Sequence, residues 1–228
     1  MKKLVLVAAM LMVFGMVTMA QATLFVRGRD TAGNQLIYDN DLNITWYDYT
    51  NIPSMPPWND NTNVPTTWQD QLNWATNLSV TLNGVIYDDW RLPNTIGGPL
   101  TFGYDGTTTT GYNITSSEFG HLYYTELGNP NWYGYGWHYG LQKTGDFEHL
   151  RINWYWSGTE AGADGAYYFY FGDGFQVVDP KSDPNGHAIA VFDGDVAGTP
   201  VPEPTSILLF GSGLVGFAGY FRKKFKQN

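Results

Sequence analysis

Apolar, uncharged segments at both ends of the chain leave only the residues between them to form a folded domain. At the N-terminus, Lys2-Lys3 precedes an apolar run from Leu4 to Met19, and Ala20-Gln21-Ala22 follows it. Basic residues, an apolar run and a small-x-small site in this order are typical of a secretory signal peptide. We therefore expect residues 1–22 to be a signal peptide that is cleaved after Ala22. An uncleaved membrane anchor is the alternative.

The C-terminal segment contains the same kinds of element in a different order. Pro202-Glu203-Pro204 comes first, an apolar run from Ser206 to Phe221 follows, and the basic cluster Arg222-Lys223-Lys224 comes near the end. As a helix the apolar run would be about 24 Å long at ~1.5 Å per residue. A bilayer core is about 30 Å thick. We expect residues 206–221 to span the membrane with the basic cluster on the cytoplasmic side.

These C-terminal features together resemble the PEP-CTERM sorting signal of Gram-negative bacteria. The matching residues are Pro202, Glu203 and Pro204, followed by the apolar span and by Arg222, Lys223 and Lys224. The resemblance implies that an exosortase-type enzyme removes residues 202–228 after transient insertion into the inner membrane. It also implies release to the cell envelope, the cell surface or an extracellular polysaccharide matrix. An ordinary tail anchor would explain the span and the basic cluster, but not the Pro-Glu-Pro.

The residues between the two ends are acidic and include no cysteine. The chain has 12 Lys+Arg and 21 Asp+Glu. The two terminal segments contain six of these basic residues and only one of the acidic residues, Glu203. Residues 23–200 therefore carry six cations and 20 anions, a net charge of −14. Such a charge repels nucleic acid and attracts divalent cations or basic partners, although acidity also serves solubility alone. Disulfides, thiolate nucleophiles and thiolate metal sites are excluded.

Residues 23–196 are predicted to form one α+β domain, which a linker at residues 197–201 joins to the sorting tail. A capping box of Thr66 and Gln69 predicts a first helix that Asn83-Gly84 ends. Apolar residues at helical spacing predict a second helix from near Thr115 to Gly128. Strands are predicted at residues 36–38, 44–47, 152–156, 166–171, 175–178 and 187–192.

Two motifs in this domain resemble the Lcl C-terminal domain family, which is placed among C-type-lectin-like folds. They are Asp89-Trp90-Arg91-Leu92-Pro93 and Tyr155-Trp156-Ser157. The resemblance covers residues 36–196 and implies two helices packed on antiparallel strands with long loops. Further matching segments are Asp39-Asn40, Thr45-Trp46, Thr67–Asp70, Trp74-Ala75, Ser117–Tyr124, Ala190-Val191 and Asp193–Val196.

The residues of these motifs favour a structural role on their own chemistry. Trp90 and Leu92 alternate on a short predicted strand, so both should point into the core. Arg91 should pair with some of the many carboxylates, and Pro93 should end the strand. Trp156 is interpreted as a core residue in the same way.

Two groups of residues are candidates for ligand binding. Asp39-Asn40-Asp41, Asp60-Asn61, Asp173 and Asp193-Gly194-Asp195 offer oxygen ligands that suit Ca²⁺, which is the one cofactor candidate, but turn chemistry also explains them. The second group is an aromatic, glycine-rich loop, whose rings could either receive sugar rings or pack on one another. The loop residues are Trp132, Tyr133, Tyr135, Trp137 and Tyr139.

No catalytic residue stands out, and we expect a protein that is not an enzyme. His121, His138, His149 and His187 form no H-x-x-x-H pair, so a metal site could only be assembled from distant residues. The hypothesis is an exported, non-catalytic module that binds a glycan or a protein. The alternatives are a purely structural component of the envelope or biofilm matrix and a glycoside hydrolase that uses two carboxylates.

Overall fold

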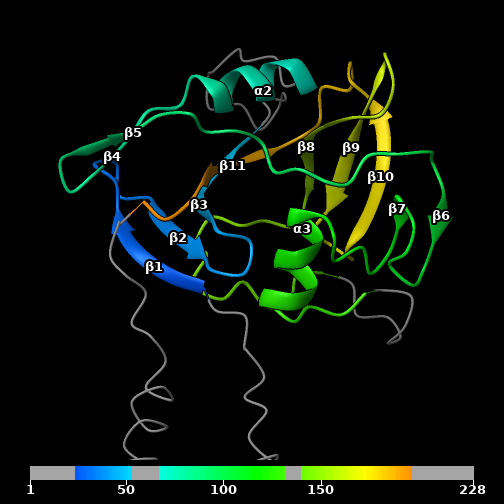
Figure 1. The fold of residues 1–228 in the computed structure, drawn as a ribbon, viewed down its shortest axis with the longest axis horizontal. Helices are drawn as coiled ribbons and strands as arrows, with labels where there is room; N and C mark the ends of the chain where they lie inside the picture. Colours follow the sequence, from blue (N-terminus) through cyan, green and yellow to red (C-terminus); the bar gives the residue numbers. More distant parts are fainter. Residues whose placement is uncertain (1–23, 53–66, 132–139, 197–228) are drawn as a thin grey trace, which may run out of the picture. The chain divides into compact units, whose positions relative to one another are not determined.

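A four-stranded sheet, a five-stranded sheet, a two-stranded hairpin and two helical segments make up the part of the chain that the structure, a computed structural model, describes: residues 24–52, 67–131 and 140–196 (Figure 1). These residues belong to one compact unit that ends at Val196. Together the elements give the mixed α+β character that the sequence predicts. Within the described ranges, no helix is both long and apolar enough to cross a bilayer.

The first sheet joins the beginning and the end of this unit. Its four strands pair antiparallel in the order β1-β2-β3-β11, so the final strand lies beside the third. A register shift between Val26 and Gly28 interrupts the first pairing. The strands are β1 (Leu24–Arg29), β2 (Gln35–Asp39), β3 (Ile44–Asn51) and β11 (Ala188–Asp193).

The second sheet has five strands in the order β6-β7-β10-β9-β8. A turn containing Asp173-Gly174 joins β9 to β10, with Gly174 at φ +82°. Figure 1 shows β6 and β7 at the outer edge of this sheet. The strands are β6 (Phe102–Gly103), β7 (Thr110–Gly111), β8 (Trp154–Glu160), β9 (Gly165–Tyr170) and β10 (Phe175–Pro180).

Helix α2 (Trp68–Thr76) begins one residue later than the sequence predicts. Its N-cap is Thr67, and Asp70 supplies the acidic member of the capping box, so the assignment to Thr66 and Gln69 is wrong. The Thr67 hydroxyl accepts the Asp70 N–H at 3.4 Å, while the Asp70 carboxylate accepts the Thr67 N–H at 3.2 Å. A carboxylate at this position also interacts favourably with the helix dipole.

The residues that follow α2 form a hairpin instead of continuing the predicted helix. The helix ends at Thr76, and β4 (Val80–Leu82) pairs antiparallel with β5 (Val85–Tyr87). Asn83 and Gly84 have φ values of +52° and +82°. Positive φ at both residues is what a type I′ hairpin turn requires. The prediction that Asn83-Gly84 ends a helix is therefore wrong.

The second helical segment consists of a short α-helical turn and a π-helix. Ser117 caps α3 (Glu118–Gly120) by accepting the Gly120 N–H at 2.9 Å, so the segment begins later than the predicted Thr115. The chain continues as η1 (His121–Glu126), and the Leu127 N–H reaches the Leu122 carbonyl at 2.9 Å. Gly128 follows with φ +60°, the left-handed conformation expected at a helix C-terminus.

Strand β11 contributes to both hydrophobic clusters of the core. Ala188 and Ala190 belong to the cluster that includes Trp68 of α2, and Ile189 and Val191 belong to the cluster beneath α3 and η1. This alternation follows from the two-residue period of a strand. Both clusters are built around large aromatic rings, which fits the 17% aromatic content of a chain without disulfides.

Candidate functional site

The Trp-Arg-Leu-Pro motif contacts β11 through the backbone of Arg91 and α3 through the Arg91 side chain. Trp90 and Leu92 are buried, while the backbone of Arg91 pairs with Val191 through two hydrogen bonds of 2.9 Å. Asp89, just before them, is exposed and has φ +63°. Pro93 is buried, and its carbonyl accepts the N–H of Gly158 on β8 at 2.8 Å. The motif thus joins β11 to β8 through its backbone.

The Arg91 side chain joins two acidic residues from distant parts of the sequence. Its guanidinium donates two bonds of 2.8 Å to Glu118 and bonds of 2.6 and 3.1 Å to Asp193. Burial lowers the pKa of Arg91, but the hydrogen bonds to Glu118 and Asp193 outweigh it and raise that pKa above its ordinary value. An arginine held this firmly supports the fold and offers no free cation to a ligand.

The Tyr-Trp-Ser motif on β8 also makes contacts within the core. The Tyr155 hydroxyl accepts the Arg151 N–H at 3.1 Å, and the Trp156 ring stacks on Tyr168 with centroids 4.1 Å apart. The carbonyl of Ser157 accepts the indole N–H of Trp68 at 2.8 Å, which fastens α2 to the sheet.

An array of aromatic side chains covers one side of the second sheet toward its β6–β7 edge. Trp154, Tyr170 and Phe175 lie opposite one another on β8, β9 and β10. The ring centroids of Trp154 and Tyr170 are 4.7 Å apart in a stacked arrangement, and those of Trp154 and Phe175 are 6.2 Å apart. We call this set of rings the aromatic face. Its members are Phe102, Tyr104, Tyr112, Trp154, Tyr170 and Phe175.

The outer part of the aromatic face is its most accessible part. Phe102 is 55% exposed and Tyr104 is 45% exposed. Their rings meet edge to face at 5.1 Å, and Tyr104 stacks on Tyr112 at 5.9 Å with an angle of 7° between the planes. Tyr112 is buried and contacts Phe175 at 5.0 Å. Ring contacts therefore run without interruption from β8 to the edge of the sheet.

A second cluster of functional side chains lies between β2 and η1. Asp39, His121 and Glu126 place one potential metal-ligand atom each within 4.8 Å of the others. His121 Nε2 is 3.2 Å from Glu126 Oε1 and 4.0 Å from Asp41 Oδ2. Hydrogen bonding to Glu126 raises the pKa of His121, whereas burial raises the pKa of Asp39. We call these four residues the Asp39–His121 cluster.

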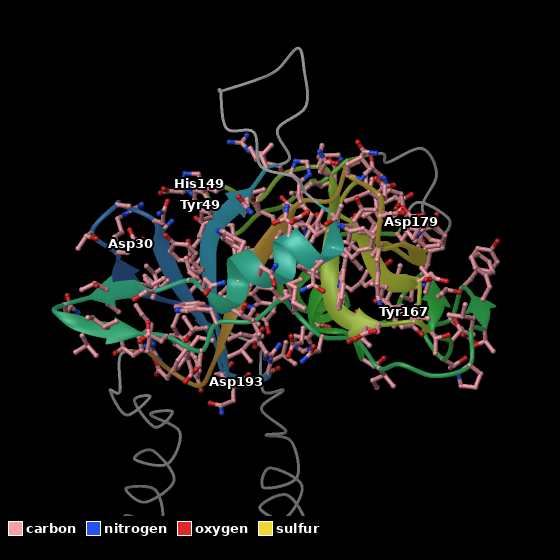
Figure 2. All side chains as sticks on the ribbon, turned by 90° about the horizontal axis from the view of Figure 1, so that it is seen from above. Asp30, Tyr49, His149, Tyr167, Asp179 and Asp193 are labelled. Carbon is pink, nitrogen blue, oxygen red and sulfur yellow. The ribbon has the colours of Figure 1, made fainter. Side chains whose placement is uncertain are left out.

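A superficially similar cluster of Asp48, Glu148 and His149 already has its own cation. Arg29 donates bonds of 2.6 and 2.9 Å to Glu148. The Asp48 carboxylate accepts the N–H groups of Glu148 and His149 at 2.8 and 3.0 Å. Figure 2 shows His149 on the opposite side of that view from Asp193. His149 of this cluster therefore offers a control for His121 of the Asp39–His121 cluster.

A pair of adjacent carboxyl groups occurs at the end of β10. Burial, together with hydrogen bonding to Asp183, raises the pKa of Asp179 to about 6. Figure 2 shows Asp179 on the opposite side of that view from His149. Glycosidase carboxylates stand about 5 to 9.5 Å apart so that substrate fits between them. Two groups in hydrogen-bond contact leave no such space, so this pair does not match that geometry.

The other calcium candidates are occupied by contacts within the protein. Asp173 accepts the Phe175 N–H at 2.9 Å, and Asp195 pairs with Arg27 at 2.6 Å. Asp193 pairs with Arg91. Of the proposed calcium ligands that the structure describes, Asp39 and Asp41 alone share a cluster with a histidine.

Several predicted site residues lie outside the described residues. They include the signal-peptide positions Ala20 and Ala22, and the calcium candidates Asp60-Asn61. The aromatic loop of Trp132, Tyr133, Tyr135, Trp137 and Tyr139 and the sorting residues Pro202, Glu203, Pro204, Arg222, Lys223 and Lys224 also lie outside them.

Comparison with known families identifies the C-terminal segment. Residues 200–223 match the PEP-CTERM protein-sorting motif. The match includes Pro202-Glu203-Pro204, the apolar run and Arg222-Lys223. The motif implies export and processing by an exosortase-type enzyme, with sorting to the envelope or surface of a Gram-negative bacterium. Searches of curated proteins and of solved structures gave no significant match.

The sequence indicated some parts of these sites and missed others. Asp39 and Asp41 were recognised as metal-ligand candidates, but their proximity to His121 and Glu126 was not. The aromatic face was missed because Phe102 and Tyr104 lie in short edge segments without a strand signature. The one available signal was the presence of aromatic residues at alternate positions of β8 (Trp154 and Trp156) and of β9 (Tyr168 and Tyr170).

Proposed function

We propose that residues 23–196 form a non-catalytic, C-type-lectin-like module that binds a neutral glycan of the cell surface or extracellular matrix. The observation that carries this proposal is the aromatic face, where Phe102 and Tyr104 are about half exposed at the end of a continuous series of rings. Large exposed rings on a fixed strand framework present flat apolar surfaces. The C–H faces of pyranose rings are complementary to such surfaces.

The charge of the domain favours a neutral glycan over an anionic ligand. Residues 23–200 have a net charge of −14. Within the described ranges, Arg27, Arg29 and Arg91 are each paired with carboxylates. A domain this acidic repels acidic polysaccharides, phosphates and nucleic acids. The sorting motif is consistent with a partner at the cell surface.

The chain enters and leaves the predicted aromatic loop beside this same face. Asn131 donates to the side chain of Asn113 at 2.8 Å, and Asn113 follows Tyr112 of the aromatic face. The Gly140 N–H reaches the Gly172 carbonyl at 2.7 Å, between Tyr170 and Phe175 in the chain. These contacts fix Asn131 and Gly140, the described residues on either side of the predicted ligand loop, to the parts of the chain that carry Tyr112 and Tyr170.

The arrangement of the described strands and helices supports the proposed C-type-lectin-like fold. The Lcl-like motifs occupy the crossing of β11 with the Trp90–Leu92 segment and the start of β8. The beginning and the end of the domain share one sheet, and the helical segments pack against the strands. Two helices, antiparallel strands and long connections agree with the expectation for a C-type-lectin-like domain.

The test is binding of the full-length protein to a neutral-glycan array, with and without Ca²⁺ and with a chelator. We expect Phe102→Ala and Tyr104→Ala each to weaken binding by about tenfold, since the loss of one ring contact is worth about 1.4 kcal/mol. Ile86→Ala is the matched control, because Ile86 is 63% exposed on the separate β4–β5 hairpin. It should leave binding unchanged.

Three outcomes would contradict the proposal. Absence of binding to any neutral glycan would favour a purely structural component of the envelope or matrix. An equal loss in Ile86→Ala and Phe102→Ala would show that the aromatic face has no specific role. Release of reducing sugar during the assay would instead favour the hydrolase alternative.

A further inference from the structure

We propose that Asp39, Asp41, His121 and Glu126 bind one divalent cation of the zinc class. The four residues come from two segments: Asp39 ends β2, Asp41 lies in the following turn, and His121 and Glu126 begin and end η1. The site is separate from the aromatic face, and its test is independent of glycan binding.

The π-helical winding of η1 places His121 and Glu126 on the same side. In an α-helix, residues five apart point about 140° away from each other, since 3.6 residues complete one turn. A π-helix has i→i+5 hydrogen bonds and more residues per turn, which brings positions i and i+5 close together. The observed result is a distance of 3.2 Å between His121 Nε2 and Glu126 Oε1. π-helical turns often occur at functional sites.

The charges of the cluster are not balanced by the protein. The Glu126 side chain is 1% exposed and Asp39 is fully buried. In the part of the chain that the structure describes, no lysine or arginine forms an ion pair with Asp39, Asp41 or Glu126. Even a protonated His121 leaves three carboxylates against one cation. Buried charge without compensation is costly, and a divalent cation would compensate it.

The pKa directions in the cluster agree with this excess of negative charge. Burial raises the pKa of Asp39, and the nearby Glu126 carboxylate raises it further. Hydrogen bonding to Glu126 raises the pKa of His121 against the opposing effect of burial, and Asp39 and Asp41 add to the increase.

The separations between the ligand atoms suit a small cation. A tetrahedral zinc site with bonds of about 2.0 Å places its ligand atoms about 3.3 Å apart. The observed distances from His121 Nε2 are 3.2 Å to Glu126 and 4.0 Å to Asp41, and the Asp39, His121 and Glu126 atoms all lie within 4.8 Å. Small side-chain rotations would close this arrangement.

The ligand types indicate which cation to expect. An imidazole nitrogen with carboxylate oxygens suits zinc and its first-row neighbours, whereas Ca²⁺ takes oxygen ligands only. The Asp39 Oδ1 atom already accepts the N–H groups of Asp41 and Leu42 at 3.1 and 3.0 Å. Its Oδ2 atom has one long contact, 3.4 Å from the indole nitrogen of Trp46. These second contacts would orient the carboxylate toward the metal.

The test is a titration of metal-free, untagged full-length protein with zinc chloride by calorimetry, supported by metal analysis after dialysis. We expect one zinc per chain that excess Ca²⁺ does not displace, and Co²⁺ should give the absorption bands of a tetrahedral site. His121→Ala and Glu126→Gln should each weaken zinc binding by at least about tenfold. His149→Ala is the matched control and should bind zinc like the wild type.

Asp41→Asn keeps the test decisive if a change at a buried ligand prevents folding. Asp41 is the most exposed member of the cluster, so its amide variant should fold normally and still bind zinc more weakly. The proposal is overturned if the wild type binds no stoichiometric zinc. It is also overturned if His149→Ala loses as much affinity as His121→Ala, or if Asp41→Asn and His121→Ala both leave binding unchanged.

Discussion

Removing the Arg91 side chain should destabilise the domain far more than removing another paired arginine. Arg91 is 25% exposed and its partner Glu118 is 17% exposed, so this pair lies between the surface and the core. Breaking a fully buried pair costs about 3 to 5 kcal/mol, and an exposed pair contributes about 0 to 1 kcal/mol. We therefore expect Arg91→Ala to lower the free energy of unfolding by about 2 to 3 kcal/mol.

The magnitude follows from the groups that this substitution leaves unsatisfied. Glu118 would keep the Asn94 N–H at 2.7 Å but lose both bonds from the guanidinium. Asp193 would lose its bonds too, but it is 74% exposed and water can replace them. Arg91→Lys should have an intermediate effect, because a single ammonium group cannot form the two parallel bonds to Glu118.

Equilibrium unfolding in urea, followed by tryptophan fluorescence, measures this difference. The matched control is Arg29→Ala, since Arg29 makes the same paired bonds to Glu148 but both side chains are about half exposed. It should change the unfolding midpoint very little. The reasoning would be refuted if Arg91→Ala and Arg29→Ala shifted the midpoint equally.

Two further predictions concern packing and pH. A Cβ at Gly186 would lie 2.0 Å from the indole nitrogen of Trp156. Gly186→Ala should therefore destabilise the domain by about 1 to 3 kcal/mol, as measured by thermal unfolding. Gly97→Ala is the control and should have little effect, because the nearest atom to a Cβ there is 3.4 Å away. Because the pKa of Asp179 in the folded state is raised to about 6, its contribution to stability is present below about pH 4 and is lost as the pH rises through 6. Asp179→Asn should therefore flatten the pH dependence of the melting temperature between pH 4 and 7, and an unchanged profile would show that Asp183 does not perturb this carboxyl.

Patterns within short segments predicted much of the fold. The strands at residues 36–38, 44–47, 166–171 and 187–192 are confirmed, because apolar and β-branched runs bounded by turn residues have few other solutions. The predicted helix end at Gly128 is also confirmed by its left-handed φ of +60°, because glycine adopts this conformation readily. Strand β8 begins and ends later than predicted, at Trp154 and Glu160.

The errors occurred where two local solutions compete or where tertiary contacts decide. Thr66 and Thr67 are both good N-cap residues, and the position of Asp70 selects the second. Asn83-Gly84 can end a helix or turn a hairpin, and pairing between β4 and β5 selects the hairpin. Periodicity shows that residues 118–127 are helical, but it cannot distinguish α from π winding, so the approach of His121 to Glu126 was not predictable.

The alternating side chains of β11 have a consequence for how the protein is made and exported. Ala188 and Ala190 complete one hydrophobic cluster, and Ile189 and Val191 complete the other. Neither cluster can be completed until almost the whole domain has been synthesised, because these residues lie at its C-terminal end. A nascent chain that lacks these four residues cannot complete either cluster. The sequence order thus places the residues that finish both parts of the core in the last strand of the domain to be synthesised and translocated.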